Sequence, residues 1–250
     1  MAEANRGRVR TEPGHKRVRA YLEGEPVVDT RSALLVWEVP YYPAYYVPLA
    51  DVRAELVPTG ETSHSPSRGD AEVFDVKVSR GVAEKAALSY ADSPLEALRG
   101  HVRLAWDGRL EWFEEDEPVF VHPKDPYKRV DILASSRHVQ VEVDGVTVAE
   151  SSQPRILFET GLPPRYYLPM TDVRLDLLRP SATTTQCPYK GTASYSSVEI
   201  DGHLTEDIVW HYPLPTPESQ KIIGLACFYD EKVDVYLDGE LQAKPKTPFS

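Results

Sequence analysis

The chain has 250 residues, of which 41% are hydrophobic, and its formal net charge is −11. A chain of this length can form two domains of about 110 to 120 residues, each with its own core. The acidic balance argues against a nucleic-acid partner, which requires a basic surface. Proline (22) outnumbers glycine (14), which favours short strands and fixed turns over long helices.

The cysteine count and the hydropathy pattern indicate a cytoplasmic protein. Two cysteines, Cys187 and Cys227, are too few for a secreted disulfide framework. No apolar run approaches the roughly 20 residues that span a bilayer, and the N-terminus lacks a signal-peptide core. We therefore expect no membrane partner. The basic residues between Arg6 and Arg19 lie in a polar stretch, and residues 1–14 are predicted to form a flexible basic tail.

The chain contains one segment twice. Residues 45–56 read YYVPLADVRAEL and residues 166–177 read YYLPMTDVRLDL, with seven of twelve positions identical. Ordinary residue usage would give about one identity in such a window. The protein is therefore an internal duplication, with an N-terminal copy expected over 15–120, a linker over 121–131 and a C-terminal copy over 132–250.

Each copy is predicted to begin with a β-hairpin. Alternating apolar residues flank Glu23-Gly24 in residues 18–28 and Asp144-Gly145 in residues 139–149. Asp-Gly between such residues favours a type I′ turn, because both central positions need positive φ. The offset of 121 between these hairpins continues through the repeated segment.

The remaining elements are also predicted in pairs. Apolar strands are predicted over 33–38 and 155–159, and half-buried strands over 51–57 and 172–178. Each copy then has one short helix, over 93–99 or 217–223, and ends in aromatic strands, over 101–113 or 225–237. No βαβ spacing occurs. The fold class is therefore mainly β, with two homologous antiparallel barrel-like or folded-sheet domains. We expect a monomer of two pseudo-symmetric domains.

Several motifs in the C-terminal copy resemble one known family. They are CPYKGTASY from Cys187, WHYP from Trp210, PPRYYLPMTDVR from Pro163, and the stretch from Ile223 to Gly239. In this order they resemble DUF427, a family of small bacterial and fungal proteins of unknown function, with the N-terminal copy as a degenerate second domain. The resemblance implies a mainly β fold. The family has also carried a nucleotidyltransferase-like label, but the chain lacks the Gly-Ser and paired acids that would hold two Mg²⁺.

A comparison of the two copies separates residues with a structural role from residues with a candidate functional role. Cys187, Tyr189 and Trp210 correspond to Ser65, Ser67 and Leu88, whereas Asp172 and Arg174 recur as Asp51 and Arg53. Residues kept in both copies are interpreted as structural, and Asp172 and Arg174 are expected to hold the strand as a pair across the fold. The differences mark the C-terminal copy as the functional one, and its marker residues are Cys187, Tyr189, Lys190, Trp210 and Tyr212.

Two kinds of site follow from these residues. Cys187 and Lys190, with Tyr189, are candidates for nucleophilic or acid–base catalysis, although a purely structural turn is favoured because no base is fixed beside the cysteine. Alternatively, an aromatic pocket with a few polar groups would bind a small organic ligand. Its predicted lining is Glu159, Tyr166, Arg174, Tyr189, Lys190, Trp210 and Tyr212.

The leading hypothesis is a small-molecule-binding protein with an aromatic pocket in the C-terminal copy. An enzyme acting through Cys187, Lys190 and Tyr189 is the first alternative. A structural or interaction protein that uses the acidic stretch from Glu111 to Glu117 is the second. No cofactor is predicted, and no metal site, because Cys and His residues lack ligand spacing.

Overall fold

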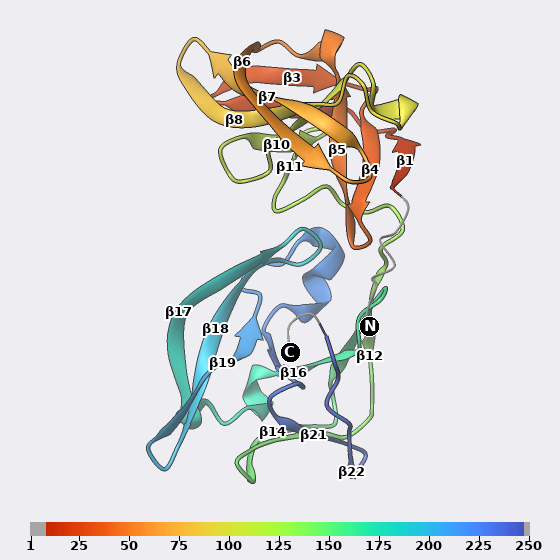
Figure 1. Ribbon diagram of the computed structural model, residues 1–250. Coiled ribbons are helices and arrows are strands. Elements are labelled where there is room, and N and C mark those ends of the chain that lie inside the picture. Colours follow the sequence, from red (N-terminus) through yellow and green to blue (C-terminus); the bar gives the residue numbers. More distant parts are fainter. Residues whose placement is uncertain (1–8, 248–250) are drawn as a thin grey trace. The chain divides into compact units, whose positions relative to one another are not determined.

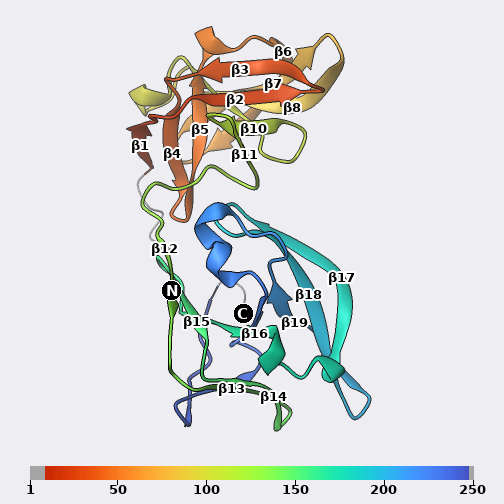
Figure 2. The ribbon, with the colours of Figure 1, turned by 180° about the vertical axis from the view of Figure 1, so that it is seen from behind.

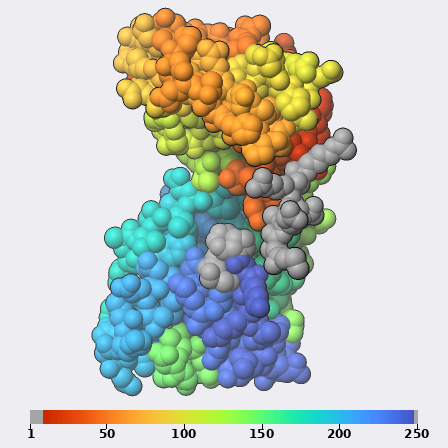
Figure 3. All heavy atoms as spheres, in the orientation of Figure 1, coloured from red at the N-terminus to blue at the C-terminus, as the bar shows by residue number. Residues whose placement is uncertain are grey.

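A computed structural model describes residues 9–247 of the chain (Figure 1). The chain divides into two compact units, Met1–Asp125 and Pro126–Ser250, which contain the N-terminal and C-terminal copies. In the space-filling view, each unit is made from one continuous half of the chain (Figure 3). Each unit has one seven-stranded and one four-stranded antiparallel sheet. The predicted duplicated, mainly β architecture is confirmed. In the described residues the sheets do not close into a barrel.

The N-terminal copy contains the first eleven strands. Its large sheet has the order β1-β4-β5-β9-β8-β7-β6, and its small sheet has the order β11-β10-β2-β3. The elements are β1 Arg10–Pro13, β2 Val18–Leu22, β3 Glu25–Thr30, β4 Leu34–Val39, β5 Tyr42–Pro48, η1 Leu49–Asp51, β6 Glu55–Ser65, β7 Gly69–Val78, β8 Gly81–Ser89, η2 Glu96–Leu98, β9 His101–Leu104, β10 Glu111–Glu114 and β11 Glu117–Val119.

The C-terminal copy repeats this arrangement (Figure 2). Its large sheet has the order β12-β15-β16-β20-β19-β18-β17, and its small sheet has the order β14-β13-β21-β22. The elements are β12 Val130–Ala134, β13 Val139–Val143, β14 Val146–Ser151, β15 Arg155–Glu159, β16 Arg165–Pro169, η3 Met170–Asp172, η4 Leu175–Leu177, β17 Leu178–Cys187, β18 Gly191–Ile200, β19 His203–His211, η5 Pro217–Ile222, β20 Leu225–Phe228, β21 Asp234–Leu237 and β22 Glu240–Leu241.

The hairpins that open each copy form as predicted. β2 pairs with β3 and β13 pairs with β14, and both turns have positive φ at their two central residues, Glu23-Gly24 and Asp144-Gly145. Alternate residues of β2 and β13 are buried, which gives each small sheet one apolar face. This face packs on the large sheet of the same copy and forms its main core.

The segments after each Tyr-Tyr-x-Pro motif differ from the prediction. Asp172 and Leu177 lie in the 3₁₀ turns η3 and η4, not in a half-buried strand, and β6 and β17 begin only at Glu55 and Leu178. The cause is a corner, because Val52 and Val173 leave the large sheet and each make one isolated bridge to the small sheet. Arg53, Arg174 and Asp176 are therefore exposed, whereas Asp51 is half-buried.

Other boundaries also differ in detail. Arg10–Pro13 form strand β1, so the predicted tail over 1–14 extends too far, while its first eight residues lie outside the described part of the chain. Val130, placed in the linker, begins β12. The predicted helices are a 3₁₀ turn at Glu96–Leu98 and a six-residue 3₁₀ segment at Pro217–Ile222.

The two adjacent tyrosines of the repeated segment point to opposite faces of the large sheet in each copy. Consecutive strand residues point to opposite faces. Tyr45 and Tyr166 accordingly pack with the main core between the sheets. Tyr46 and Tyr167 join a second buried cluster on the other face. This second face carries the candidate site in each copy.

Candidate functional site

Glu159 and Lys190 form a buried ion pair in the C-terminal copy. Glu159 ends strand β15, Lys190 lies in the turn before β18, and the Lys190 Nζ donates to Glu159 Oε2. Their side chains are only 9% and 13% exposed. Burial acts to lower the pKa of Lys190, but the adjacent Cys187 and Glu159 outweigh it and raise that pKa. Lys190 is therefore a cation held inside the protein.

The turn that carries Lys190 is fixed from both sides. Lys190 N–H donates to the Cys187 carbonyl at 3.3 Å. Gly191 has φ of +101°, and a Cβ there would lie 3.0 Å from the Leu214 carbonyl oxygen. The Tyr189 carbonyl accepts hydrogen bonds from Thr216 Oγ1 at 2.5 Å and Ser219 Oγ at 2.9 Å. The segment that leads into η5 thus holds the turn in place (Figure 2).

A cluster of aromatic side chains lies beside this ion pair. Trp210 Nε1 donates to the Tyr167 hydroxyl at 3.1 Å, and both side chains are buried with Tyr212 and Tyr195 in one cluster. Burial raises the pKa of both Tyr167 and Tyr212, which therefore stay protonated donors at neutral pH. Cys187 interacts electrostatically with Lys190, Tyr167 and Tyr212. These interactions place the thiol beside the ion pair.

A second polar group on the same face was not predicted from the sequence. Arg165 donates to both oxygens of Glu231 at 2.8 and 2.6 Å, and it lies 3.7 Å from Asp230. Its guanidinium is 5.7 Å from the Trp210 ring centroid. Burial raises the pKa of Asp230 to about 7. Burial also acts to raise the pKa of Glu231, but its bond with Arg165 is the main influence that lowers it to about 2.

A signal for this group was present in the repeat. Strand pairing places Arg165 opposite Leu157, and Ala44 opposite Val36 in the N-terminal copy. Arg165 therefore replaces an alanine, and it differs between copies as clearly as Cys187 does.

Three of the predicted ligand residues lie elsewhere or take another role. Arg174 is exposed and binds Asp176 at 2.8 and 2.7 Å, so it does not pair with Asp172 across the fold and does not approach Lys190. Tyr166 packs on the opposite face of the sheet. Tyr189 is buried, and its carbonyl anchors the turn. The structure therefore brings together Cys187, Glu159, Lys190, Trp210 and Tyr212, with Tyr167 as an additional member.

The N-terminal copy has a related cluster at the corresponding positions. Glu38 accepts a hydrogen bond from the Tyr46 hydroxyl at 2.6 Å and is ion-paired with both Arg68 and Arg103. Arg68 lies over the Tyr90 ring, with its Cζ 5.2 Å from the centroid. A buried acid–base pair beside tyrosines is therefore common to both copies, although their other members differ.

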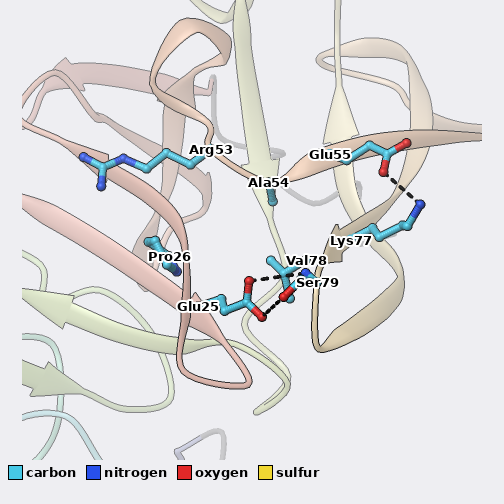
Figure 4. A pocket seen from close by; sticks show the side chains of 8 residues that line it. All are labelled: Glu25, Pro26, Arg53, Ala54, Glu55, Lys77, Val78 and Ser79. Atoms are coloured by element: carbon cyan, nitrogen blue, oxygen red, sulfur yellow. Dashed lines mark hydrogen bonds and ion pairs between the residues drawn. The ribbon is translucent and has the colours of Figure 1, made fainter.

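A groove of about 420 Å³ lies on the N-terminal copy, away from this cluster (Figure 4). Its charged side chains are satisfied by their neighbours, since Glu25 accepts a hydrogen bond from Ser79 and Glu55 pairs with Lys77. It contains none of the predicted site residues. We assign it no role.

The acidic stretch from Glu111 to Glu117 is used within the N-terminal copy. Glu114 is buried, accepts a hydrogen bond from the Tyr45 hydroxyl at 3.0 Å and pairs with Lys16. Asp116 binds Arg19 at 2.6 Å. Much of this charge is therefore neutralised internally, which weakens the argument for an acidic docking face.

Within residues 9–247, no group of three or more His, Cys, Asp or Glu side chains is arranged to hold a metal ion. Over the same residues, every helix is too short or too polar to cross a bilayer.

Comparison with known proteins identifies one family. The profile described as "Domain of unknown function (DUF427)" matches the chain twice, over residues 10–115 and 131–239. The two matches follow the two copies and together cover most of the chain. No curated protein matches the chain.

Proposed function

Since this chain belongs to the DUF427 family, as a tandem two-copy member, we propose that its C-terminal copy binds a small organic molecule. The ligand would bind at the Glu159–Lys190 ion pair, against the aromatic side chains of Trp210 and Tyr212. The family description names no activity, so the proposal rests on the site itself.

The observation that carries the proposal is the burial of a complete ion pair beside a thiol. Removing Glu159 and Lys190 from water costs more than a surface pair, and a buried pair is weak evidence for stability alone. Perturbed ionisable groups that converge on an aromatic surface are typical of ligand and active sites. Lys190 and Glu159 would supply a donor and an acceptor, and the rings an apolar contact surface.

A matched pair of lysine variants tests this proposal. Lys190 and Lys244 both pair with a carboxylate, but the Lys244 side chain is 49% exposed. Mixtures of small organic molecules would be screened by ligand-observed NMR against the wild type, Lys190→Met and Lys244→Met. We expect ligands that bind the wild type and Lys244→Met and lose at least about tenfold in affinity for Lys190→Met. Ligands that bind all three proteins equally would contradict the proposal.

Catalysis through Cys187 is a second candidate, favoured by the contact between its thiol and Lys190. Cys227, in contrast, is fully buried. Cys187 is half-buried, and a cysteine beside a basic side chain is an arrangement that catalytic nucleophiles use. Iodoacetamide should therefore label Cys187 and spare Cys227 in the native protein, and Lys190→Met should slow the labelling. Equal labelling rates with and without Lys190 would leave binding as the remaining function.

A further inference from the structure

The buried cluster of the N-terminal copy has an uncompensated positive charge. Glu38 is the single carboxylate paired with two guanidiniums, those of Arg68 and Arg103. Their side chains are 17%, 16% and 30% exposed. In the described residues, neither arginine has another carboxylate within 4.0 Å. Because arginine does not lose its proton at physiological pH, the cluster keeps a net charge of about +1.

Arg103 is also poorly satisfied as a hydrogen-bond donor. Its Nε lies 2.9 Å from Glu38 Oε1, yet this buried atom has no hydrogen-bond partner, because the N–H does not point at the carboxylate. Arg68, in contrast, donates to Ser65 Oγ at 3.0 Å and to the Tyr46 hydroxyl at 3.1 Å. A buried donor without a protein partner costs free energy unless water or a ligand satisfies it.

The C-terminal copy balances its charges at the same place. Strand pairing puts Arg103 opposite Tyr46 and Cys227 opposite Tyr167, so the second arginine of the N-terminal cluster corresponds to a neutral thiol. The C-terminal arginine on this face, Arg165, is held by two hydrogen bonds to Glu231. The excess of guanidinium is therefore specific to the N-terminal copy.

We propose that the N-terminal copy is a second binding site, which takes the carboxylate of a small organic acid at Arg68 and Arg103. A planar guanidinium suits a carboxylate, and one excess charge matches a monoanion better than a dianion such as phosphate. Glu38 is a positioning residue that holds both guanidiniums on one side. The bound anion would neutralise the cluster and supply Arg103 with an acceptor.

The experiment uses the full chain and sodium acetate as the probe. The Nε–H resonance of Arg103 would be followed by ¹⁵N NMR during titration with acetate, at constant ionic strength set by chloride. We expect a saturable shift of this resonance. Inorganic phosphate should give a weaker effect than acetate. A wild-type resonance that does not respond to acetate, or that responds only to phosphate, would overturn the proposal without any variant.

Two arginine variants localise the effect. Arg103→Gln removes the excess charge, whereas Arg80→Gln changes an exposed arginine of the same copy, 72% exposed at the β7–β8 turn. Acetate should bind at least about tenfold more weakly to Arg103→Gln and equally well to Arg80→Gln, because one charge-assisted hydrogen bond is lost in the first variant alone. Equal acetate affinity of a folded Arg103→Gln and the wild type would overturn the assignment.

Discussion

The two copies use one scaffold to hold two different buried polar clusters. Both place a glutamate at the end of a strand, a tyrosine on its partner strand and a base in the next long hairpin turn: Glu38, Tyr46 and Arg68, or Glu159, Tyr167 and Lys190. The N-terminal copy adds a second arginine, whereas the C-terminal copy adds a thiol, an indole and a separate Arg165–Glu231 pair. The acid–base pair is common to both copies, so the difference between the two proposed sites lies in the neighbours of this pair.

The choice of base also separates the copies. Lysine can lose its proton when it is buried without a carboxylate, but arginine cannot. Removal of the glutamate therefore has different consequences in the two copies. The predictions below use this contrast first and then move to smaller effects.

The largest effect that does not depend on pH is expected from Glu38→Gln. It leaves Arg68 and Arg103 charged, largely buried and without a carboxylate, so we expect the free energy of unfolding of the N-terminal copy to fall by about 3 kcal/mol at every pH from about 6 to 9. Urea unfolding with fluorescence of the tryptophans of this copy, Trp37, Trp106 and Trp112, would measure it. A penalty that disappears at high pH would show that the guanidiniums are not the cause.

Glu159→Gln is the matched variant in the C-terminal copy. Burial acts to lower the pKa of Lys190, and loss of Glu159 removes one of the charges that oppose this effect. We expect the pKa of Lys190 in the folded variant to fall below the ordinary lysine value of about 10.4. As the pH approaches that value, the folded state then binds fewer protons than the unfolded state, and stability rises with pH. The penalty should be largest near neutral pH and shrink toward about pH 10. Trp210, the single tryptophan of this copy, reports its unfolding.

The next prediction concerns Asp230, which the N-terminal copy lacks, and its effect on how stability depends on pH. Its folded-state pKa of about 7, raised by burial, lies above the unfolded value of about 3.9. The folded state binds more protons between these values, so the stability of the C-terminal copy should fall by up to about 4 kcal/mol from about pH 4 to 7. Asp230→Asn should remove this slope.

The comparison between wild type and Asp230→Asn also controls for His211. Burial lowers the pKa of His211, so its contribution to stability rises with pH through about 6.5, opposite in sign to that of Asp230. Both proteins retain His211, so its contribution is common to both profiles. If the two urea midpoints change in parallel between pH 4 and 7, the assignment to Asp230 is wrong.

Local patterns were sufficient to predict the duplication and the hairpins. Asp144-Gly145 and Glu23-Gly24 specify their turns through backbone geometry alone, and the alternation in β2 and β13 specifies the buried face. The corner at Val173 could not be predicted in this way. The 172–178 pattern suits a strand, but a single tertiary bridge from Val173 to Ala149 turns the chain toward the other sheet.

Several candidate residues that differ between the copies lie close together in the structure, whereas the sequence misplaced a residue whose position depends on the face of the sheet. Cys187, Lys190 and Trp210 converge because one hairpin turn and one strand meet on the same face. Tyr166 lies on the opposite face, a consequence of strand alternation that composition cannot show. The Arg165–Glu231 pair joins residues 66 positions apart, and this contact depends on the strand order.

A smaller loss of stability, similar in the two copies, is expected when the turn glycines are replaced. Gly191→Ala and Gly69→Ala each place a side chain at positive φ, with the nearest atoms at 3.0 and 3.2 Å. Each should destabilise its copy by about 1–3 kcal/mol, because strain and a close contact combine. Gly202→Ala, at φ of +81° with no atom within 4 Å, provides the control for strain alone. A Gly191→Ala urea midpoint equal to that of Gly202→Ala would contradict the role of the Leu214 contact.

The smallest effect is expected at Arg174, which the sequence placed among the ligand residues. Its side chain is 56% exposed and its partner Asp176 is 61% exposed, so water and salt screen the pair. Arg174→Met should therefore leave the urea midpoint and the ligand affinity of the C-terminal copy unchanged. Arg165→Met is the contrasting variant, because it removes a 12% exposed guanidinium from Glu231 and Asp230 and should destabilise this copy clearly. A loss of ligand affinity in Arg174→Met alone would move the site from the Lys190 face to the exposed corner that carries Arg174.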